Sequence, residues 1–215
     1  VLDRDGDVLS WADENGSRKY YDNATVRKAT LHAVGDAQGK IGTGALVAFA
    51  DRLSGYNLFT GAYSPLGAGN DLYLTLDARY NYIAYEALAG RKGAVGVYHY
   101  ETGEVLCMVS SPSYDPLDVP ADIETSDRYK GAYLNRFLSS TFTPGSVFKT
   151  VTLTAAIEEI PDLFERTWDC QGSIQIGDET IICSGTHGQQ NIGTAFANSC
   201  NVAFAQIAQE QIGRA

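Results

Sequence analysis

The segment 143–159 constrains the fold of this chain more than any other. Pro144 and Gly145 give a sharp entry to a predicted helix that begins at Gly145 or Ser146 and runs to about Glu159. Its apolar residues lie on nearly all sides; they are Val147, Phe148, Val151, Leu153, Ala155, Ala156 and Ile157. Because a helix that is apolar all round is a buried one, we expect it in the centre of a domain.

Two side chains at the start of this helix carry a chemical signal. Ser146 and Lys149 stand three residues apart and so share one helix face, where the amine can reach the hydroxyl. A serine becomes a good nucleophile when a base removes its proton, and a desolvated lysine can be that base. Unpaired amides of the first turn would meet a developing oxyanion. The alternative is that Ser146 only caps the helix while Lys149 extends to water.

A second pair follows at Ser199-Cys-Asn201, just before a predicted helix over 201–212 that stops at Gly213. A hydroxyl there could relay a proton to a leaving group, and an amide could hold a substrate backbone. The alternative is a routine helix cap by Ser199 or Asn201. The order and spacing of the two pairs favour a joint site with Ser146 and Lys149 as well as Ser199 and Asn201.

Composition and charge exclude several classes of protein. The net charge of −10 argues against a nucleic-acid surface, which needs a basic patch. No run of about 18 apolar residues and no signal peptide is present. The chain begins at Val1 without an initiator methionine, so we expect it to be a piece of a longer protein.

The four cysteines give no recognisable pattern. They form no Cys-x-x-Cys pair, and His187 is the only histidine near two of them, so the sequence predicts no zinc site or other metal site. Cys107 lies in an apolar run and is expected to pack as a small hydrophobic residue. Cys170 and Cys183 could form a disulfide outside the cytoplasm or remain as two buried thiols.

The rest of the chain indicates two domains with mixed helices and strands. The turn-rich segment 63–70 marks a predicted boundary between domains 1–69 and 70–215. Predicted strands cover 1–10, 19–22, 24–30, 71–76, 94–100 and 105–110, the last two joined as a hairpin by 101–104. Predicted helices cover 44–53, the stretch from Asp77 as N-cap to Gly90, and 133–138.

With these motifs in view, the chain resembles the class B penicillin-binding proteins. The resemblance rests on Thr143-Pro-Gly-Ser-Val-Phe-Lys149, on Ser199-Cys-Asn201, on the hairpin with Gly93-Ala-Val and Thr102-Gly-Glu-Val105, and on Val109-Ser-Ser-Pro-Ser-Tyr-Asp-Pro116. The start, Val1-Leu-Asp-Arg-Asp-Gly6, is similar to the segment just after the membrane anchor of that family. Residues 10–69 are the least specific part.

The resemblance implies an α+β transpeptidase fold of the penicillin-binding and β-lactamase type, with an antiparallel sheet and a helical subdomain. Residues 1–69 would form a small pedestal domain, and 70–215 an incomplete transpeptidase domain. The implied activity is a D,D-transpeptidase that cross-links peptidoglycan stem peptides without a cofactor. Ser146 would be the nucleophile, Lys149 the general base, and Ser199 with Asn201 the second motif. The implied setting is the outer face of a bacterial membrane, with β-lactams as ligands and a membrane glycosyltransferase as partner.

One departure from the family pattern is serious. The third motif, Lys-Thr/Ser-Gly on a sheet strand, is absent from these 215 residues, and with it one oxyanion amide. We therefore expect a truncated or cleaved portion that is inactive in isolation. A serine β-lactamase is an alternative, although no deacylating glutamate can be picked from the sequence. A β-lactam sensor that acylates without cross-linking is another.

Overall fold

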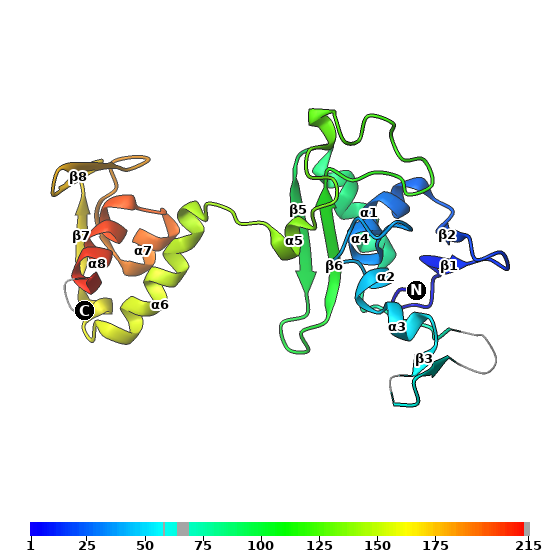
Figure 1. Ribbon diagram of the computed structural model, residues 1–215. Helices are drawn as coiled ribbons and strands as arrows, with labels where there is room; N and C mark the ends of the chain where they lie inside the picture. Colours follow the sequence, from blue (N-terminus) through cyan, green and yellow to red (C-terminus); the bar gives the residue numbers. More distant parts are fainter. Residues whose placement is uncertain (58, 64–68, 213–215) are drawn as a thin grey trace. The chain divides into compact units, whose positions relative to one another are not determined.

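The computed structural model describes residues 1–57, 59–63 and 69–212. The chain forms two compact units that divide between Thr141 and Phe142 (Figure 1). Helices and antiparallel strands mix in both units, which confirms the predicted α+β class. The boundary predicted at 69/70 lies inside the first unit, where it stays a prediction.

The first unit is built around an antiparallel hairpin and two helices. Strands β5 (Gly93–Tyr98) and β6 (Val105–Ser111) pair as predicted. Helices α1 (Ala24–Val34) and α4 (Ala78–Leu88) pack against each other and against β6 (Figure 1). Asp77 caps α4 through its side chain, as expected, by accepting from the amides of Arg79 and Tyr80. Buried Ala84, Cys107 and Val109 form the core between α4 and the hairpin.

The prediction of a strand over 24–30 was wrong, because this segment is the first part of α1. β-branched Thr25 and Val26 favour a strand locally. Asn23, however, accepts hydrogen bonds from both of their amides, at 2.8 and 3.2 Å, and so begins a helix. Packing of α1 against α4 and β6 then outweighs the local preference.

The start of the chain is a tight turn instead of the predicted strand over 1–10. Leu2 pairs with Val8 across this turn. The buried carboxylate of Asp3 accepts from the amides of Asp5 and Asp7, both at 2.9 Å, and from the amide of Ala78 at 3.1 Å. Asp3 therefore joins the first turn of the chain to the start of α4.

The other predicted elements of this unit are shorter than expected. Phe49 interrupts the predicted helix 44–53 and leaves α2 (Ala45–Ala48) and α3 (Ala50–Leu53). The predicted strand 71–76 keeps one bridge, between Leu2 and Tyr73. The remaining elements are β1 (Ser10–Ala12), β2 (Arg18–Tyr20), β3 (Tyr56–Asn57), β4 (Ala62–Tyr63), the 3₁₀ turn Asp127–Tyr129 and α5 (Arg136–Ser139). Most of the predicted boundary segment 63–70 lies outside the described residues.

The second unit contains the two motif segments. A 3₁₀ turn, Gly145–Phe148, continues directly into α6 (Lys149–Glu159), and α6 packs against α8 (Asn201–Ile212). Between these helices lie the 3₁₀ turn Leu163–Glu165, strands β7 (Thr167–Cys170), β8 (Ser173–Ile176), β9 (Glu179–Ile182) and β10 (Gly188–Asn191), and α7 (Ile192–Ala197). Strand β7 pairs antiparallel with β10, and β8 with β9. The helix α8 was predicted, with Gly213 outside the described residues; α7 and the four strands were not.

Helix α6 is not buried all round, contrary to the prediction. Val151, an apolar residue of α6, is 55% exposed, and Val147, on the 3₁₀ turn before it, is 73% exposed. Only the side facing α8 contributes to the core, through buried Ala156 and partly buried Leu153. This unit is small, and α8 alone covers too little surface to bury a whole helix.

Candidate active site

The backbone before α6 presents Ser146 to solvent. Gly145 has a φ of +56°, a left-handed conformation that suits glycine, and the chain then enters the 3₁₀ turn. Ser146 is exposed in this turn. Half-buried Lys149 follows one turn later, and its Nζ lies 3.1 Å from Oγ of Ser146. A substrate carbonyl can therefore approach the Ser146 hydroxyl from solvent while the amine of Lys149 contacts the same hydroxyl.

The second motif lies at the turn between α7 and α8. Ser199 has a φ of +49°, which is uncommon for a residue other than glycine and is typical of functional sites. This conformation turns both oxygens of Ser199 toward the lysine, with O and Oγ each 3.0 Å from Nζ of Lys149. Oδ1 of Asn201, the first residue of α8, lies 2.7 Å from the same nitrogen.

The structure thus brings all four predicted site residues together around one amine. Asn201 is oriented by a second contact, because its Nδ2 donates to the carbonyl oxygen of Ile182 at 2.9 Å. This contact places Oδ1, and not the amide nitrogen, toward Lys149. Both oxygen partners of carbonyl type, Ser199 O and Asn201 Oδ1, can only accept.

Counting donors shows what this arrangement can do. A neutral amine has two N–H groups and one lone pair. If the two carbonyl oxygens take both N–H groups, the lone pair remains for a hydroxyl hydrogen. Oγ of Ser146, at 3.1 Å from Nζ of Lys149, is then placed to donate its proton to the amine. The centroid of the Phe204 ring, from α8, lies 5.9 Å from the same Nζ, which is within range to stabilise the ammonium that results.

Behind this site, the structure gathers residues that the sequence did not connect. One sulfur each from Cys170, Cys183 and Cys200 and one ring nitrogen of His187 lie within 4.8 Å of one another. The sequence did not anticipate this convergence, and its prediction of no metal site stays a prediction. Their convergence depends on the pairing of β7 with β10, which no local sequence pattern predicted.

The cysteines themselves are buried free thiols. Of the two alternatives for Cys170 and Cys183, the structure has the unbridged one. Burial raises the pKa of Cys183, but backbone N–H groups of Asn201 and Val202 donate to its sulfur and bring the pKa below its ordinary value. Burial raises the pKa of Cys200. Cys107 is buried as expected, and its burial raises the pKa of the thiol to about 11.

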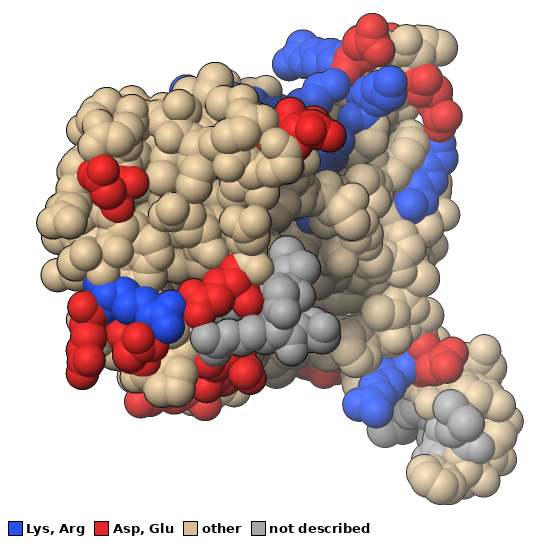
Figure 2. Space-filling view, turned by 90° about the vertical axis from the view of Figure 1, so that its left-hand side faces the viewer, with Lys and Arg blue, Asp and Glu red and all other residues tan. Residues whose placement is uncertain are grey.

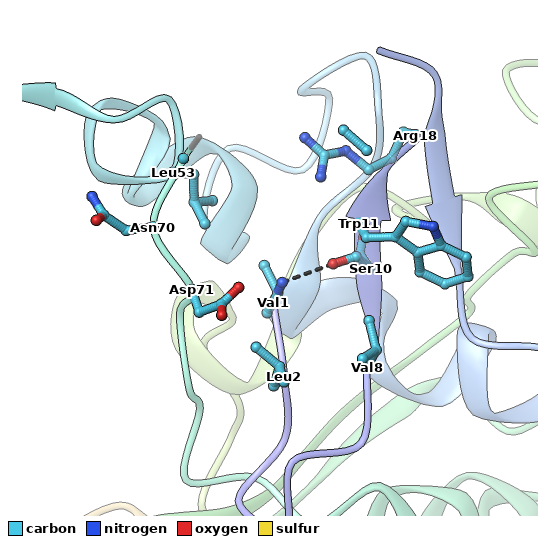
Figure 3. A pocket seen from close by; sticks show the side chains of 11 residues that line it. Val1, Leu2, Val8, Ser10, Trp11, Arg18, Leu53, Asn70 and Asp71 are labelled. Carbon is cyan, nitrogen blue, oxygen red and sulfur yellow. Dashed lines mark hydrogen bonds between the residues drawn. The ribbon is translucent and has the colours of Figure 1, made fainter. Parts of the chain in front are cut away.

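The first unit has a cleft of its own, with a volume of about 700 Å³. Figure 3 shows Val1 and Asp71 on one side and Trp11 and Arg18 on the other. The amino group of Val1 donates to the carbonyl oxygen of Ser10 at 2.7 Å, and this contact joins the start of the chain to β1. None of the four motif residues lines this cleft.

The surface charge is uneven. Most of the second-unit surface that faces the viewer in Figure 2 carries neither basic nor acidic side chains, and charged ones gather along its lower edge.

The chain is similar to known proteins of one family. Residues 93–215 match the family model of the penicillin binding protein transpeptidase domain. Stage V sporulation protein D of Bacillus subtilis is 32% identical over 165 residues, which cover 71% of this chain and 24% of that protein. Peptidoglycan D,D-transpeptidase PbpA of Mycobacterium tuberculosis is 31% identical over 179 residues, which cover 74% of this chain and 35% of that protein. The chain thus spans about a third or less of these relatives.

Solved structures show the same fold. The D,D-transpeptidase domain of a peptidoglycan glycosyltransferase from Eggerthella lenta superposes with a TM-score of 0.77 at 31% identity, over 99% of this chain and 51% of that one. PBP2 of Pseudomonas aeruginosa, in complex with WCK 5153, also gives a TM-score of 0.77, at 24% identity, over 96% of this chain and 50% of that one. With its two motifs in contact and its matching family model, the chain belongs to the transpeptidase-domain family of class B penicillin-binding proteins.

Proposed function

We propose that this chain carries the nucleophile half of a peptidoglycan D,D-transpeptidase, which cross-links stem peptides through a serine acyl-enzyme. The observation that carries the proposal is the set of contacts around Nζ of Lys149, which lies within 3.1 Å of Ser146 Oγ, Ser199 Oγ and Asn201 Oδ1. The name of the relative PbpA, a peptidoglycan D,D-transpeptidase, supports it.

In the first half-reaction, Oγ of Ser146 attacks the carbonyl carbon of the penultimate D-Ala as Lys149 takes its proton. The resulting oxyanion is stabilised by the backbone amide of Ser146, which lies at the start of the 3₁₀ turn, where amides have no partner within a helix. Ser199, in contact with the lysine, passes the proton to the nitrogen of the terminal D-Ala. The C–N bond breaks, D-Ala leaves as an amine, and the penultimate residue remains as an ester on Ser146. The second hydrogen on Nδ2 of Asn201 is available to hold a substrate carbonyl.

The second half-reaction reverses the proton path. An amine from a neighbouring stem peptide attacks the ester carbonyl, and its proton returns through Ser199 and Lys149 to Oγ of Ser146 as the C–O bond breaks. A β-lactam would enter the same path, with its ring C–N bond opening in the first step. The leaving nitrogen then stays tethered to the acyl group, so the ester persists.

We propose that these 215 residues are inactive alone. They contain no Lys-Thr-Gly or Lys-Ser-Gly motif, and in the described part of the first unit β5 pairs only with β6. Loss of one oxyanion donor typically costs about 3 kcal/mol of transition-state stabilisation. Rapid hydrolysis of a chromogenic β-lactam by the 215-residue chain would contradict this.

The setting we propose is the outer face of a bacterial membrane, with an anchor upstream and a glycosyltransferase of the cell-wall machinery as partner. Among the described residues, no helix has the length and apolar character needed to cross a bilayer. The anchor would therefore belong to a segment outside them. The name of the Eggerthella lenta protein places a D,D-transpeptidase domain within a peptidoglycan glycosyltransferase, so the two activities are named together in that protein.

Labelling with a fluorescent penicillin tests the proposed nucleophile in the full-length protein that contains this chain. We expect the wild type to form a covalent adduct, and Ser146→Ala to form none. Ser173→Ala, which changes an exposed serine of β8, is the matched control and should label normally. Equal labelling of Ser146→Ala and the control would remove Ser146 from the role. An adduct that persists for hours fits a transpeptidase, whereas loss within seconds would indicate a β-lactamase.

A further inference from the structure

The cluster behind the proposed active site is assembled from four separate segments. Cys170 ends β7, Cys183 follows β9, His187 precedes β10, and Cys200 precedes α8. One donor atom from each lies within 4.8 Å of the other three. The three cysteines are buried, and His187 is half-buried.

Three of the six donor–donor distances in this cluster match those around a tetrahedral ion, and the other three lie within 4.8 Å. Zinc bonds of about 2.3 Å to sulfur and about 2.1 Å to nitrogen place two sulfurs roughly 3.8 Å apart, and a sulfur and a nitrogen roughly 3.6 Å apart. In the structure the sulfurs of Cys183 and Cys200 lie 3.9 Å apart. Nδ1 of His187 lies 3.6 Å from the sulfur of Cys170 and 3.5 Å from that of Cys183. A disulfide would need about 2.05 Å between two sulfurs.

The surrounding backbone suits sulfur atoms that carry negative charge. The amide of Asn201 donates to the sulfur of Cys183 at 3.3 Å, and the amide of Ala203 donates to that of Cys200 at 3.4 Å. Both donors belong to the first turn of α8, where the helix dipole also favours negative charge. Hydrogen bonds of this kind orient and stabilise metal ligands.

We propose that Cys170, Cys183, Cys200 and Nδ1 of His187 bind one zinc ion. Three thiolates and one imidazole are soft to intermediate donors, which favour zinc over magnesium or calcium. Four protein ligands leave no open position, so the ion has a structural role and does not activate water. Binding releases the thiol protons, and His187 ligates as the neutral ring with its hydrogen on Nε2.

The zinc site would hold the second motif in place, a consequence that rests on the proposed function. Cys200 stands between Ser199 and Asn201 in the sequence. Cys183 accepts from the backbone of Asn201, and its neighbour Ile182 accepts from the side chain of the same residue. The ion therefore ties the β8–β9 hairpin to the turn that faces Lys149, and its ligands act as positioning residues.

Metal analysis of the full-length protein, purified with reductant and without chelator, tests the site directly. We expect about one zinc per chain. Cys183→Ser and Cys200→Ser should lose most of it, whereas Cys107→Ala, which changes the buried cysteine outside the cluster, should retain it. Cobalt exchanged into the wild type should give the intense thiolate-to-metal and visible bands of a tetrahedral site. The zinc content and the cobalt spectrum of the wild type test the site without any variant, so a variant that fails to fold does not affect these two results.

Two results would overturn the metal site. One is a wild type that holds substoichiometric zinc and binds no cobalt when reduced. The other is peptide mapping that finds Cys183 joined to Cys170 or Cys200 by a disulfide as the main species.

The positioning role has a separate readout. We expect chelation of the zinc to slow acylation by penicillin by about tenfold or more, and added zinc to restore the rate. Unchanged acylation after full zinc removal would contradict that role alone. Ser146→Ala should still bind about one zinc while forming no adduct. Zinc binding without acylation in the wild type would thus count against the proposed function, and not against the site.

Discussion

Oδ1 of Asn201 lies 2.7 Å from Nζ of Lys149, while the amide nitrogen of the same side chain donates to the carbonyl oxygen of Ile182. This double contact fixes which end of the amide the lysine meets. A neutral oxygen takes one N–H of the amine without adding charge to the site.

Replacement of Asn201 by Asp tests this relationship. A carboxylate in contact with Nζ would hold Lys149 in its protonated form, because opposite charges at this distance favour both ionised states. We expect the rate of acylation by penicillin in Asn201→Asp to fall at neutral pH and to recover at higher pH, so that its pH profile moves upward. Asn198→Asp, at an exposed position of the preceding turn, is the control. Profiles that coincide for Asn201→Asp and the wild type would contradict the argument.

Removal of the amine itself should have a larger effect. Lys149→Met keeps most of the apolar stem and loses the base, so acylation should slow by about 10²- to 10⁴-fold at all pH values. Stopped-flow or gel-based labelling measures the rate. Lys130→Met, at an exposed lysine in the first unit, should react like the wild type. A Lys149→Met protein that acylates within a factor of two or so of wild type would remove Lys149 from the role of general base.

Local patterns predicted the contacts within each of the two motifs because the geometry there is local. Ser146 and Lys149 stand one turn apart, and Ser199 and Asn201 flank one turn, so only the meeting of the two pairs depended on tertiary structure. That the two pairs belong to one site was predicted from the resemblance to a family.

Where the sequence misled, distant contacts decided the outcome. In α1, a cap by Asn23 and packing on α4 outweighed β-branched residues that favour a strand. The cysteine cluster lies further from any local rule. Cys170 and Cys200 are 30 positions apart, and they meet through the pairing of β7 with β10 and through the start of α8.

The salt bridge between Arg27 and Asp115 should stabilise the first unit. The guanidinium contacts both carboxylate oxygens, at 2.8 and 2.6 Å, and the two side chains are 12% and 11% exposed. Asp115→Asn would leave the arginine without its counter-charge, so we expect a loss of about 3 kcal/mol of unfolding free energy at pH 7. Asp122→Asn, at an exposed carboxylate of the same unit, should change little. Urea unfolding at pH 7 measures both.

The same pair predicts a pH dependence. Burial raises the pKa of Asp115, but the hydrogen bonds from Arg27 outweigh it and hold the pKa below its usual value of 3.8. Because the folded form binds this proton less readily than the unfolded one, the stabilisation is present above about pH 4 and is lost as the pH falls below it. As the pH falls below about 4, the unfolding free energy of the wild type should therefore decrease more than that of Asp115→Asn. Parallel losses would contradict the pair's contribution.

Buried His32 predicts a second, separate acid transition. Burial lowers the pKa of this imidazole to about 4, against an ordinary value of 6.5, and Nε2 lies 2.8 Å from the carbonyl oxygen of Ala132. Between these two values the unfolded chain binds a proton that the folded chain refuses, so stability falls as the pH drops from 6.5 to about 4. The loss should reach about 3 kcal/mol. His32→Gln, which cannot titrate, should lose less over this window; equal slopes in urea unfolding would refute the assignment.

A close packing contact in the first unit gives the last prediction. An alanine Cβ at Gly96, in β5, would lie 1.9 Å from Cε2 of Phe137 in α5, and 2.6 Å from a second ring carbon. Since real Cβ atoms do not approach so closely, Phe137 or α5 must move, and Gly96→Ala should cost about 1–3 kcal/mol of unfolding free energy. At Gly42 the added Cβ meets nothing within 4 Å, so Gly42→Ala is the matched control. Truncation of the ring in Gly96→Ala/Phe137→Ala removes the clash, so the two changes should be non-additive, and strict additivity would show that the contact is not formed.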